Sequence, residues 1–223
     1  GTVHVAQWGT YITTPEVSSS SATISVRTSI ENHNQVNKNM ILRSVVNNEA
    51  GKEIAAVETP VLLAASGKTD VEQNLNVVSP SLWSVDAPTL YTLHSIVLEG
   101  TKINDSYTTT FGIRKIEFDK DKGFLLNGQH IKMNGVCLHH DAGCLGSAVP
   151  VQAWVRRLQL LKEMGCNAYR CAHNPPSPEL LDACDRLGIL VMDENRRLSS
   201  APEDMADLEA LVRRDRNHPS VIL

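Results

Sequence analysis

Hydrophobic and polar residues alternate with a period of two through the first half of the chain. Ile24, Val26 and Ile30 fall on one face of such a segment. The intervening Ser25 and Arg27 fall on the other face, a pattern typical of a half-buried β-strand. Residues 71–77 alternate again, and residues 40–46 form an apolar run. Further strands are expected at residues 51–57, 90–98 and 107–111. Short strands at this spacing, with no helical period between them, predict an immunoglobulin-like antiparallel β-sandwich of about seven strands.

The period changes in the second half of the chain. From residue 151 to 161, apolar side chains recur at the i, i+3, i+4 and i+7 spacing of an amphipathic helix. Ser177 and Pro178 mark the start of a second helix, and Gly188 marks its end. A continuous apolar run at residues 189–192 is typical of a buried parallel strand. A third helix is expected at residues 203–214, and further strands are expected at residues 131–138, 167–170 and 221–223.

The resulting order, β-α-β-α-β-α-β, predicts about four βα units of a (β/α)8 TIM barrel. The fold class is therefore multi-domain, β plus α/β. We expect a sandwich domain at residues 1–112, followed by the N-terminal half of a TIM barrel at residues 113–223. A complete barrel needs about 250 residues, so the chain is expected to be truncated. An open half-barrel exposes an unpaired strand edge, which offers a route to self-association.

Composition narrows the class of protein. Hydrophobic residues make up 42% and charged residues 21% of the 223 residues, as in ordinary globular proteins. The first 112 residues carry 6 basic and 10 acidic side chains, and the rest carry 15 of each, so neither half predicts binding to nucleic acid. No apolar run approaches the ~20 residues of a membrane span, and no signal peptide is visible. The sequence therefore leaves two cellular locations as alternatives for a bacterial protein: the cytoplasm, or the periplasm and the exterior of the cell.

Six sequence motifs carry a resemblance to a known family. Residues 82–91 read LWSVDAPTLY, residues 111–114 read FGIR, and residues 124–128 and 134–136 read FLLNG and NGV. Residues 167–175 read NAYRCAHNP, residues 185–194 read DRLGILVMDE, and residues 214–222 read RDRNHPSVI. In this order they resemble glycoside hydrolase family 2, the β-galactosidase and β-glucuronidase group. The runs LHHD at 138–141 and DENR at 193–196 are most similar to those of bacterial β-galactosidases.

The resemblance implies a retaining β-glycosidase of carbohydrate catabolism, which hydrolyses O-glycosidic bonds of β-galactosides. β-Glucuronides and β-mannosides stay open as substrates. Retaining hydrolysis needs two carboxyl groups about 5–5.5 Å apart. In the family, the acid/base Glu follows strand four and the nucleophilic Glu comes later, so both are expected beyond Leu223. We therefore expect no catalytic residue within this chain and no activity from it alone. Val3-His4-Val5 resembles the linker that trails a preceding jelly-roll domain.

A carbohydrate is the expected partner, and one set of polar residues is expected to contact it. These candidates follow the first three barrel strands: His139, Asp141, Arg170, His173, Glu194 and Asn195. The resemblance assigns sugar contacts to Asp141 and His173. It assigns Arg170 to electrostatic support of the catalytic carboxylates.

Each of these assignments has a structural alternative. Asp141 is also a common turn residue, and His173 is a possible plain loop residue. Arg170 alternatively forms an ion pair with Asp193 or Glu194. His139 and His140 cannot both face inward, because alternate residues of a strand point to opposite faces, so one of them is expected to pack against a helix.

A zinc site is the main alternative in this region. Cys137, His139, His140 and Cys144 lie close together in the sequence, and zinc favours such ligands. No Cys-x2-Cys pair occurs, so we expect no metal here. The odd number of cysteines, five, predicts no disulfide framework, and we expect no cofactor. Some β-galactosidases bind magnesium through a Glu-Thr-His segment, but residues 195–199 read NRRLS here, and that site is not supported.

A second class of function is a non-catalytic carbohydrate-binding or adhesion module, in which the sandwich is the working part. The second half carries motifs of βα units, such as RCAH at 170–173 and DRNHP at 215–219. They argue against this class, because a sandwich module does not need such motifs.

Overall fold

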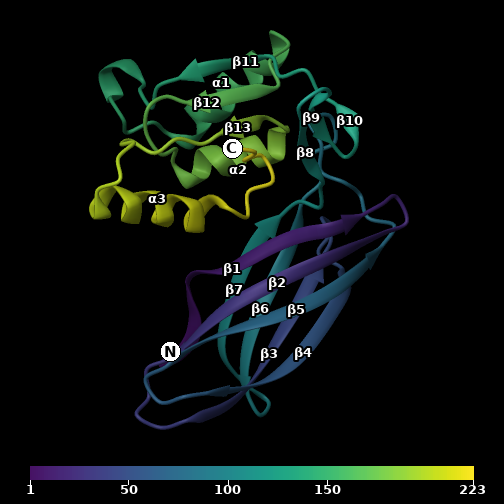
Figure 1. Cartoon of the computed structure of the whole chain (residues 1–223), viewed down its shortest axis with the longest axis vertical. Helices are drawn as coiled ribbons and strands as arrows, with labels where there is room; N and C mark the ends of the chain where they lie inside the picture. The colour runs from purple at the N-terminus through teal and green to yellow at the C-terminus, as the bar shows by residue number, and fades with distance from the viewer. The chain divides into compact units, whose positions relative to one another are not determined.

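The computed structural model describes residues 1–223, which divide into two compact units. The first unit comprises Gly1–Ser81 and Leu90–Ile113. The second comprises Leu82–Thr89 and Arg114–Leu223, so a short segment from the middle of the first half belongs to the second unit. Figure 1 labels the strands and helices of both units.

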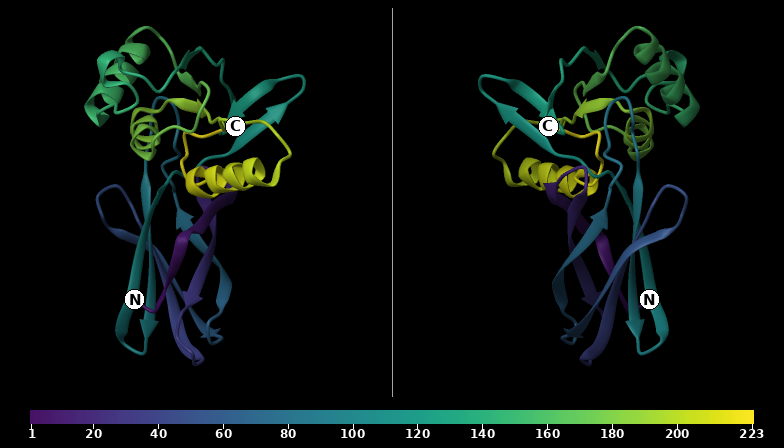
Figure 2. Two further views of the ribbon diagram at one scale, coloured as in Figure 1. Left: turned by 90° about the vertical axis from the view of Figure 1, so that its left-hand side faces the viewer. Right: turned by 90° about the vertical axis from the view of Figure 1, so that its right-hand side faces the viewer.

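The first unit is a β-sandwich. Its strands are β1 (Val3–Val17), β2 (Ser21–Asn32), β3 (Lys38–Asn47), β4 (Glu53–Leu63), β5 (Lys68–Val78), β6 (Tyr91–Glu99) and β7 (Lys102–Phe111). One sheet has the order β1-β2-β5 and the other the order β4-β3-β6-β7, with antiparallel pairing throughout. Figure 2 shows these strands as two layers. The predicted sandwich of about seven strands is therefore confirmed.

The core of the sandwich lies between the inner faces of its two sheets. On β2, Ile24, Val26 and Ile30 are fully buried, as the period-two alternation predicts. The residues that form the central cluster come from both sheets: Val3, Val5, Ile30, Met40, Leu42, Val61, Leu63, Val71 and Val97. A buried Gln73 also links the layers, because its side chain accepts a hydrogen bond from Ser44 Oγ (2.7 Å) and donates one to Leu42 O (3.1 Å).

The first strand corrects one expectation from the sequence. Val3-His4-Val5 is not a linker but the start of β1, and Val3 and Val5 belong to the buried core. The pattern is hidden in the sequence because the pairing of β1 with β2 shifts register between Val5 and Thr10. Trp8 has a positive φ of 50° within that irregular stretch, so the alternation of faces does not continue through it.

The second unit contains a small antiparallel sheet and a parallel sheet. The antiparallel strands are β8 (Ile116–Asp119), β9 (Gly123–Leu126) and β10 (Gln129–His130). The parallel strands are β11 (Gly135–Leu138), β12 (Ala168–Cys171) and β13 (Leu190–Met192), in that order across the sheet. The helices are α1 (Val151–Glu163), α2 (Pro178–Leu187) and α3 (Pro202–Asp215), with a 3-10 turn, η1, at Gly143–Leu145. No helix is both long enough and apolar enough to span a membrane.

Helices α1 and α2 share one hydrophobic core with the parallel sheet. Trp154 and Leu158 of α1 and Leu181 and Cys184 of α2 are all buried in it, together with Val191 of β13. The predicted start and end of α2 are confirmed, with Pro178 in its first turn and a left-handed Gly188 as its C-cap. Ser177 occupies the N-cap position, but its side chain makes no capping hydrogen bond.

Two of the predicted barrel strands are shorter than the sequence indicates. The first begins at Gly135 rather than residue 131, because β10 and a connecting stretch occupy residues 129–134. The fourth is reduced to a single parallel bridge between Val191 and Val221. Hydrogen bonds to β13 still follow the parallel pattern, since Val191 N donates to Ser220 O and Ile222 N donates to Val191 O. The parallel sheet is thus open and forms no closed barrel.

Candidate functional site

The C-terminal ends of the parallel strands bring together three polar side chains. Arg170 lies on β12, His173 follows that strand, and Glu194 follows β13. Parallel pairing aligns Arg170 with Met192, so the chain leaves both strands at the same edge of the sheet. In α/β folds this edge is where ligands and substrates bind.

Glu194 is held at both oxygens. Arg170 Nη2 lies 2.8 Å from Glu194 Oε2, and His173 Nδ1 lies 2.8 Å from Glu194 Oε1. The Glu194 side chain is only 18% exposed, whereas those of Arg170 and His173 are 39% and 53% exposed. Arg170 Nη2 also lies 3.4 Å from Nδ1 of His173, so the three side chains form one connected cluster.

The same contacts set the charge of Glu194. The hydrogen bond from His173 and the positive charge of Arg170 hold the pKa of Glu194 below its ordinary value, although partial burial acts in the opposite direction. Glu194 is therefore an ionised acceptor at neutral pH and cannot donate a proton as a general acid. Of the two ion-pair partners that the sequence left open for Arg170, the structure selects Glu194.

The two adjacent histidines point to different neighbours. His139 lies edge-on to His173, with ring centroids 5.6 Å apart, and so extends the Arg170–His173–Glu194 cluster. His140 packs against Trp154 of α1 at 4.9 Å. The alternation argument for these residues therefore agrees with the structure, and the split also separates two of the ligands that a zinc site here needs.

Two further candidates make local structural contacts. Asp141 Oδ1 accepts a hydrogen bond from Gly143 N at 2.9 Å, which is the contact of a turn residue. Asn195 is buried, and its side-chain amide donates to Arg197 O at 3.2 Å. Neither residue is hydrogen-bonded to Glu194.

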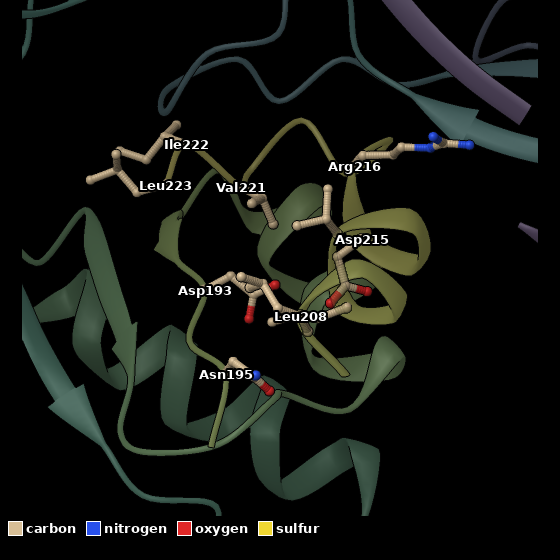
Figure 3. A pocket seen from close by; sticks show the side chains of 10 residues that line it. Asp193, Asn195, Leu208, Asp215, Arg216, Val221, Ile222 and Leu223 are labelled. Atoms are coloured by element: carbon tan, nitrogen blue, oxygen red, sulfur yellow. The ribbon is translucent and has the colours of Figure 1, made fainter. Parts of the chain in front are cut away.

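A cavity of about 310 Å³ lies between the end of β13, helix α3 and the last residues of the chain. Its lining is mainly apolar, with Leu208, Val221 and Ile222 beside Asn195. Figure 3 shows Asp193 and Asp215 on the wall of this pocket as well. Arg170, His173 and Glu194 are not among the residues that line this cavity.

The Asp193–Asp215 pair is a feature that sequence reasoning missed. Burial, together with the charge and hydrogen bond of Asp215, raises the pKa of Asp193 to about 7. Arg214 donates to both oxygens of Asp215 at 2.7 Å, so a cation lies beside this pair of carboxyl groups. Sequence spacing gives no signal for it, since the two residues lie on different elements.

A second buried cluster lies beneath the sheet. His218 Nδ1 is 2.6 Å from Asp185 Oδ2, and Asp185 Oδ1 accepts a hydrogen bond from Ser220 N at 3.0 Å. Trp83 is fully buried and its indole N–H donates to Asp185 O at 2.9 Å. These contacts join the Leu82–Thr89 segment, α2 and the end of the chain, so His218 makes a structural contact.

Family models match both halves of the chain. Residues 3–114 match the model described as "Glycosyl hydrolases family 2", and residues 117–209 match "Glycosyl hydrolases family 2, TIM barrel domain". The chain belongs to glycoside hydrolase family 2. The resemblance carried by the six motifs is confirmed, and the parallel sheet is the start of this family's TIM barrel.

Individual relatives agree with this assignment. The chain is 44% identical over 235 residues to the β-galactosidase BoGH2A of Bacteroides ovatus, a match that covers 100% of this chain and 28% of that protein. It is 41% identical to a putative β-glucuronidase of Formosa agariphila, over 71% of this chain and 16% of that one. The crystal structure of a family 2 member from Bacteroides cellulosilyticus superposes with a TM-score of 0.94 at 41% identity, covering 99% of this chain and 31% of that one.

The chain therefore spans less than a third of the length of each of these three relatives. Its residues hold the sandwich and the first barrel strands of the glycoside hydrolase family 2 fold. Within that frame, Arg170, His173 and Glu194 stand at the strand ends where a TIM barrel keeps its active site.

Proposed function

We propose that this chain is part of a retaining β-glycosidase that hydrolyses β-galactosides, and that it contributes one wall of the sugar-binding pocket. The observation that carries the proposal is the Arg170–His173–Glu194 cluster at the C-terminal ends of β12 and β13. A sugar ring presents several hydroxyl groups, each of which needs a fixed donor or acceptor. The cluster offers both, because Glu194 accepts hydrogen bonds and the exposed Arg170 donates them.

His139 extends this wall through its edge contact with His173. The resemblance also supports Asp141 as a sugar contact, and the position of Asn195 after β13 makes it a further candidate. Both residues also make the structural contacts described above. In this proposal the ionised Glu194 binds sugar hydroxyl groups and does not serve as the catalytic acid. The acid/base and nucleophilic carboxylates come from sequence beyond Leu223, so the 223-residue chain alone is inactive.

A β-glucuronide is the second candidate substrate, favoured by the 41% identity to a putative β-glucuronidase. A glucuronide carries a carboxylate, which needs a cation beside it. Arg170 is the cation of the described cluster, but protein groups already engage its guanidinium. Nη2 lies 2.8 Å from Glu194 Oε2, and Nη1 donates to Cys137 Sγ at 3.8 Å. This engagement favours a neutral galactoside at the same position.

The test uses chromogenic β-galactosides and β-glucuronides with two proteins, the 223-residue chain and a longer form that continues through the whole barrel. We expect turnover of the β-galactoside by the longer form only. In the longer form, Glu194→Gln removes the ion pair with Arg170 and should lower kcat/KM by at least about 10-fold. His130→Ala is the matched control, because His130 is exposed on β10 and contacts no member of the cluster.

Hydrolysis by the 223-residue chain itself would contradict the assignment of both catalytic carboxylates to later sequence. A longer form with higher kcat/KM on the glucuronide would replace the substrate class while leaving the reaction type in place.

A further inference from the structure

A histidine–glutamate–histidine cluster lies on the outer surface of the sandwich. The register of the antiparallel strands places His4 of β1 directly opposite Glu31 of β2. His33 follows Glu31 by two residues, and its backbone N–H donates to Thr2 O at 2.7 Å. Cross-strand partners and i, i+2 neighbours share one face of a sheet, so the three side chains converge.

The ligand atoms are already spaced as in a metal site. Nε2 of His33 lies 3.3 Å from Glu31 Oε2, and Nε2 of His4 lies 3.7 Å from the same oxygen. All three atoms lie within 4.8 Å of one another. Zinc binds nitrogen and oxygen ligands at about 2.0–2.1 Å in a tetrahedron, which places neighbouring ligand atoms about 3.3 Å apart.

We propose that His4, Glu31 and His33 form a binding site for a first-row divalent cation, with Zn²⁺ as the ion it fits. Two imidazoles and one carboxylate are ligands of borderline metals, whereas Mg²⁺ and Ca²⁺ prefer sites made of oxygen alone. Three protein ligands leave the fourth tetrahedral position to water. This cation site serves neither the sugar pocket nor the proposed hydrolysis.

The two carboxylate oxygens of Glu31 have different neighbours. Lys68 Nζ lies 3.5 Å from Oε1 of Glu31, so the lysine engages the oxygen that the histidines do not face. Both histidines face Oε2, so this is the oxygen of Glu31 that is available to a cation.

Two features limit the affinity of the site. The rings of His4 and His33 are stacked at 5.1 Å with an angle of 7° between them, so one ring must turn before both nitrogens aim at one ion. His33 is 61% exposed and has room to turn. Nδ1 of His4 is buried without a hydrogen-bond partner, and zinc sites without such an outer contact bind typically 10–100-fold more weakly. We therefore expect micromolar rather than tighter binding.

The experiment is calorimetric titration of the whole chain with Zn²⁺ after its accessible thiols have been blocked with iodoacetamide. We expect one site, and no heat from Mg²⁺. His33→Asn should weaken zinc binding by at least about 10-fold. His94→Asn is the control, because His94 lies on β6 of the same unit and bonds only to Thr108. Lys68→Met should tighten binding, since it removes a positive charge from beside the ion.

Equal zinc affinity in the unsubstituted chain and His33→Asn would overturn the proposal, as would the absence of any site at millimolar zinc. Tighter binding by Lys68→Met supports it independently, because this variant removes no ligand. A result in which His94→Asn and His33→Asn weaken binding equally would also overturn it.

Discussion

Gly188 is the residue at which the structure of the second unit predicts the largest effect of a single methyl group. It caps α2 in a left-handed conformation, with φ of 67°. A Cβ built on Gly188 would lie 2.2 Å from Val85 O and 2.8 Å from the Val85 carbonyl carbon. Both contacts are with backbone atoms, which cannot rotate away as a flexible side chain would.

The cost of Gly188→Ala has two parts. A residue with a Cβ loses about 1–2 kcal/mol in the left-handed region. The clash adds to this, because the Val85 segment must move, and Lys162 Nζ donates to Val85 O at 3.2 Å. Loss of that contact and of local packing contributes about 2 kcal/mol more, so we expect a total of about 3–4 kcal/mol.

Gly128→Ala is the matched control. Gly128 also has a positive φ, of 77°, but a Cβ there meets nothing within 4 Å. Only the conformational cost of about 1–2 kcal/mol then applies. The two variants therefore separate backbone strain from steric overlap.

The assay is urea-dependent alkylation of Cys184, followed by mass spectrometry. Cys184 is fully buried on α2, and burial raises the pKa of its thiol, so it reacts only when the unit opens. The urea midpoint should fall much further for Gly188→Ala than for Gly128→Ala. Equal shifts in the two variants would refute the close approach between Gly188 and the Val85 segment.

Two further changes test the buried polar contacts of the second unit. Trp83→Phe removes the hydrogen bond to Asp185 O and part of a fully buried ring. It should lower the free energy of unfolding by about 2–3 kcal/mol in the same alkylation assay, and an unchanged midpoint would exclude Trp83 as an anchor. Asp193→Asn tests the raised pKa of Asp193. The folded-state pKa is about 7, so the protonated side chain contributes its full stabilisation below pH ~4, and this contribution is lost as the pH rises through 7. The variant should therefore gain stability relative to the unsubstituted chain between pH 4 and pH 8, by about 1–2 kcal/mol after solvent screening, and a pH-independent difference would show that Asp193 is already ionised.

Local pattern was sufficient for most of the secondary structure. The period-two runs predicted β2 and β5, and an apolar run predicted β3. The helical spacing with Ser177, Pro178 and Gly188 predicted α2, because all these signals depend on residues only a few positions apart. The sequence also predicted Arg170, His173 and Glu194 as site residues, through their places after the strands and through the family resemblance. Their meeting at one edge is a consequence of parallel pairing.

Tertiary structure alone decided which distant segments meet. It placed the Leu82–Thr89 segment in the second unit, paired Asp193 with Asp215, and set His4 opposite Glu31. These contacts depend on strand register and on closing long loops, and neither leaves a periodic trace in the sequence. A one-residue shift in the pairing of β1 with β2 would turn His4 to the other face of the sheet. The alternation of side chains therefore identifies a strand, but it does not identify the residues with which that strand pairs.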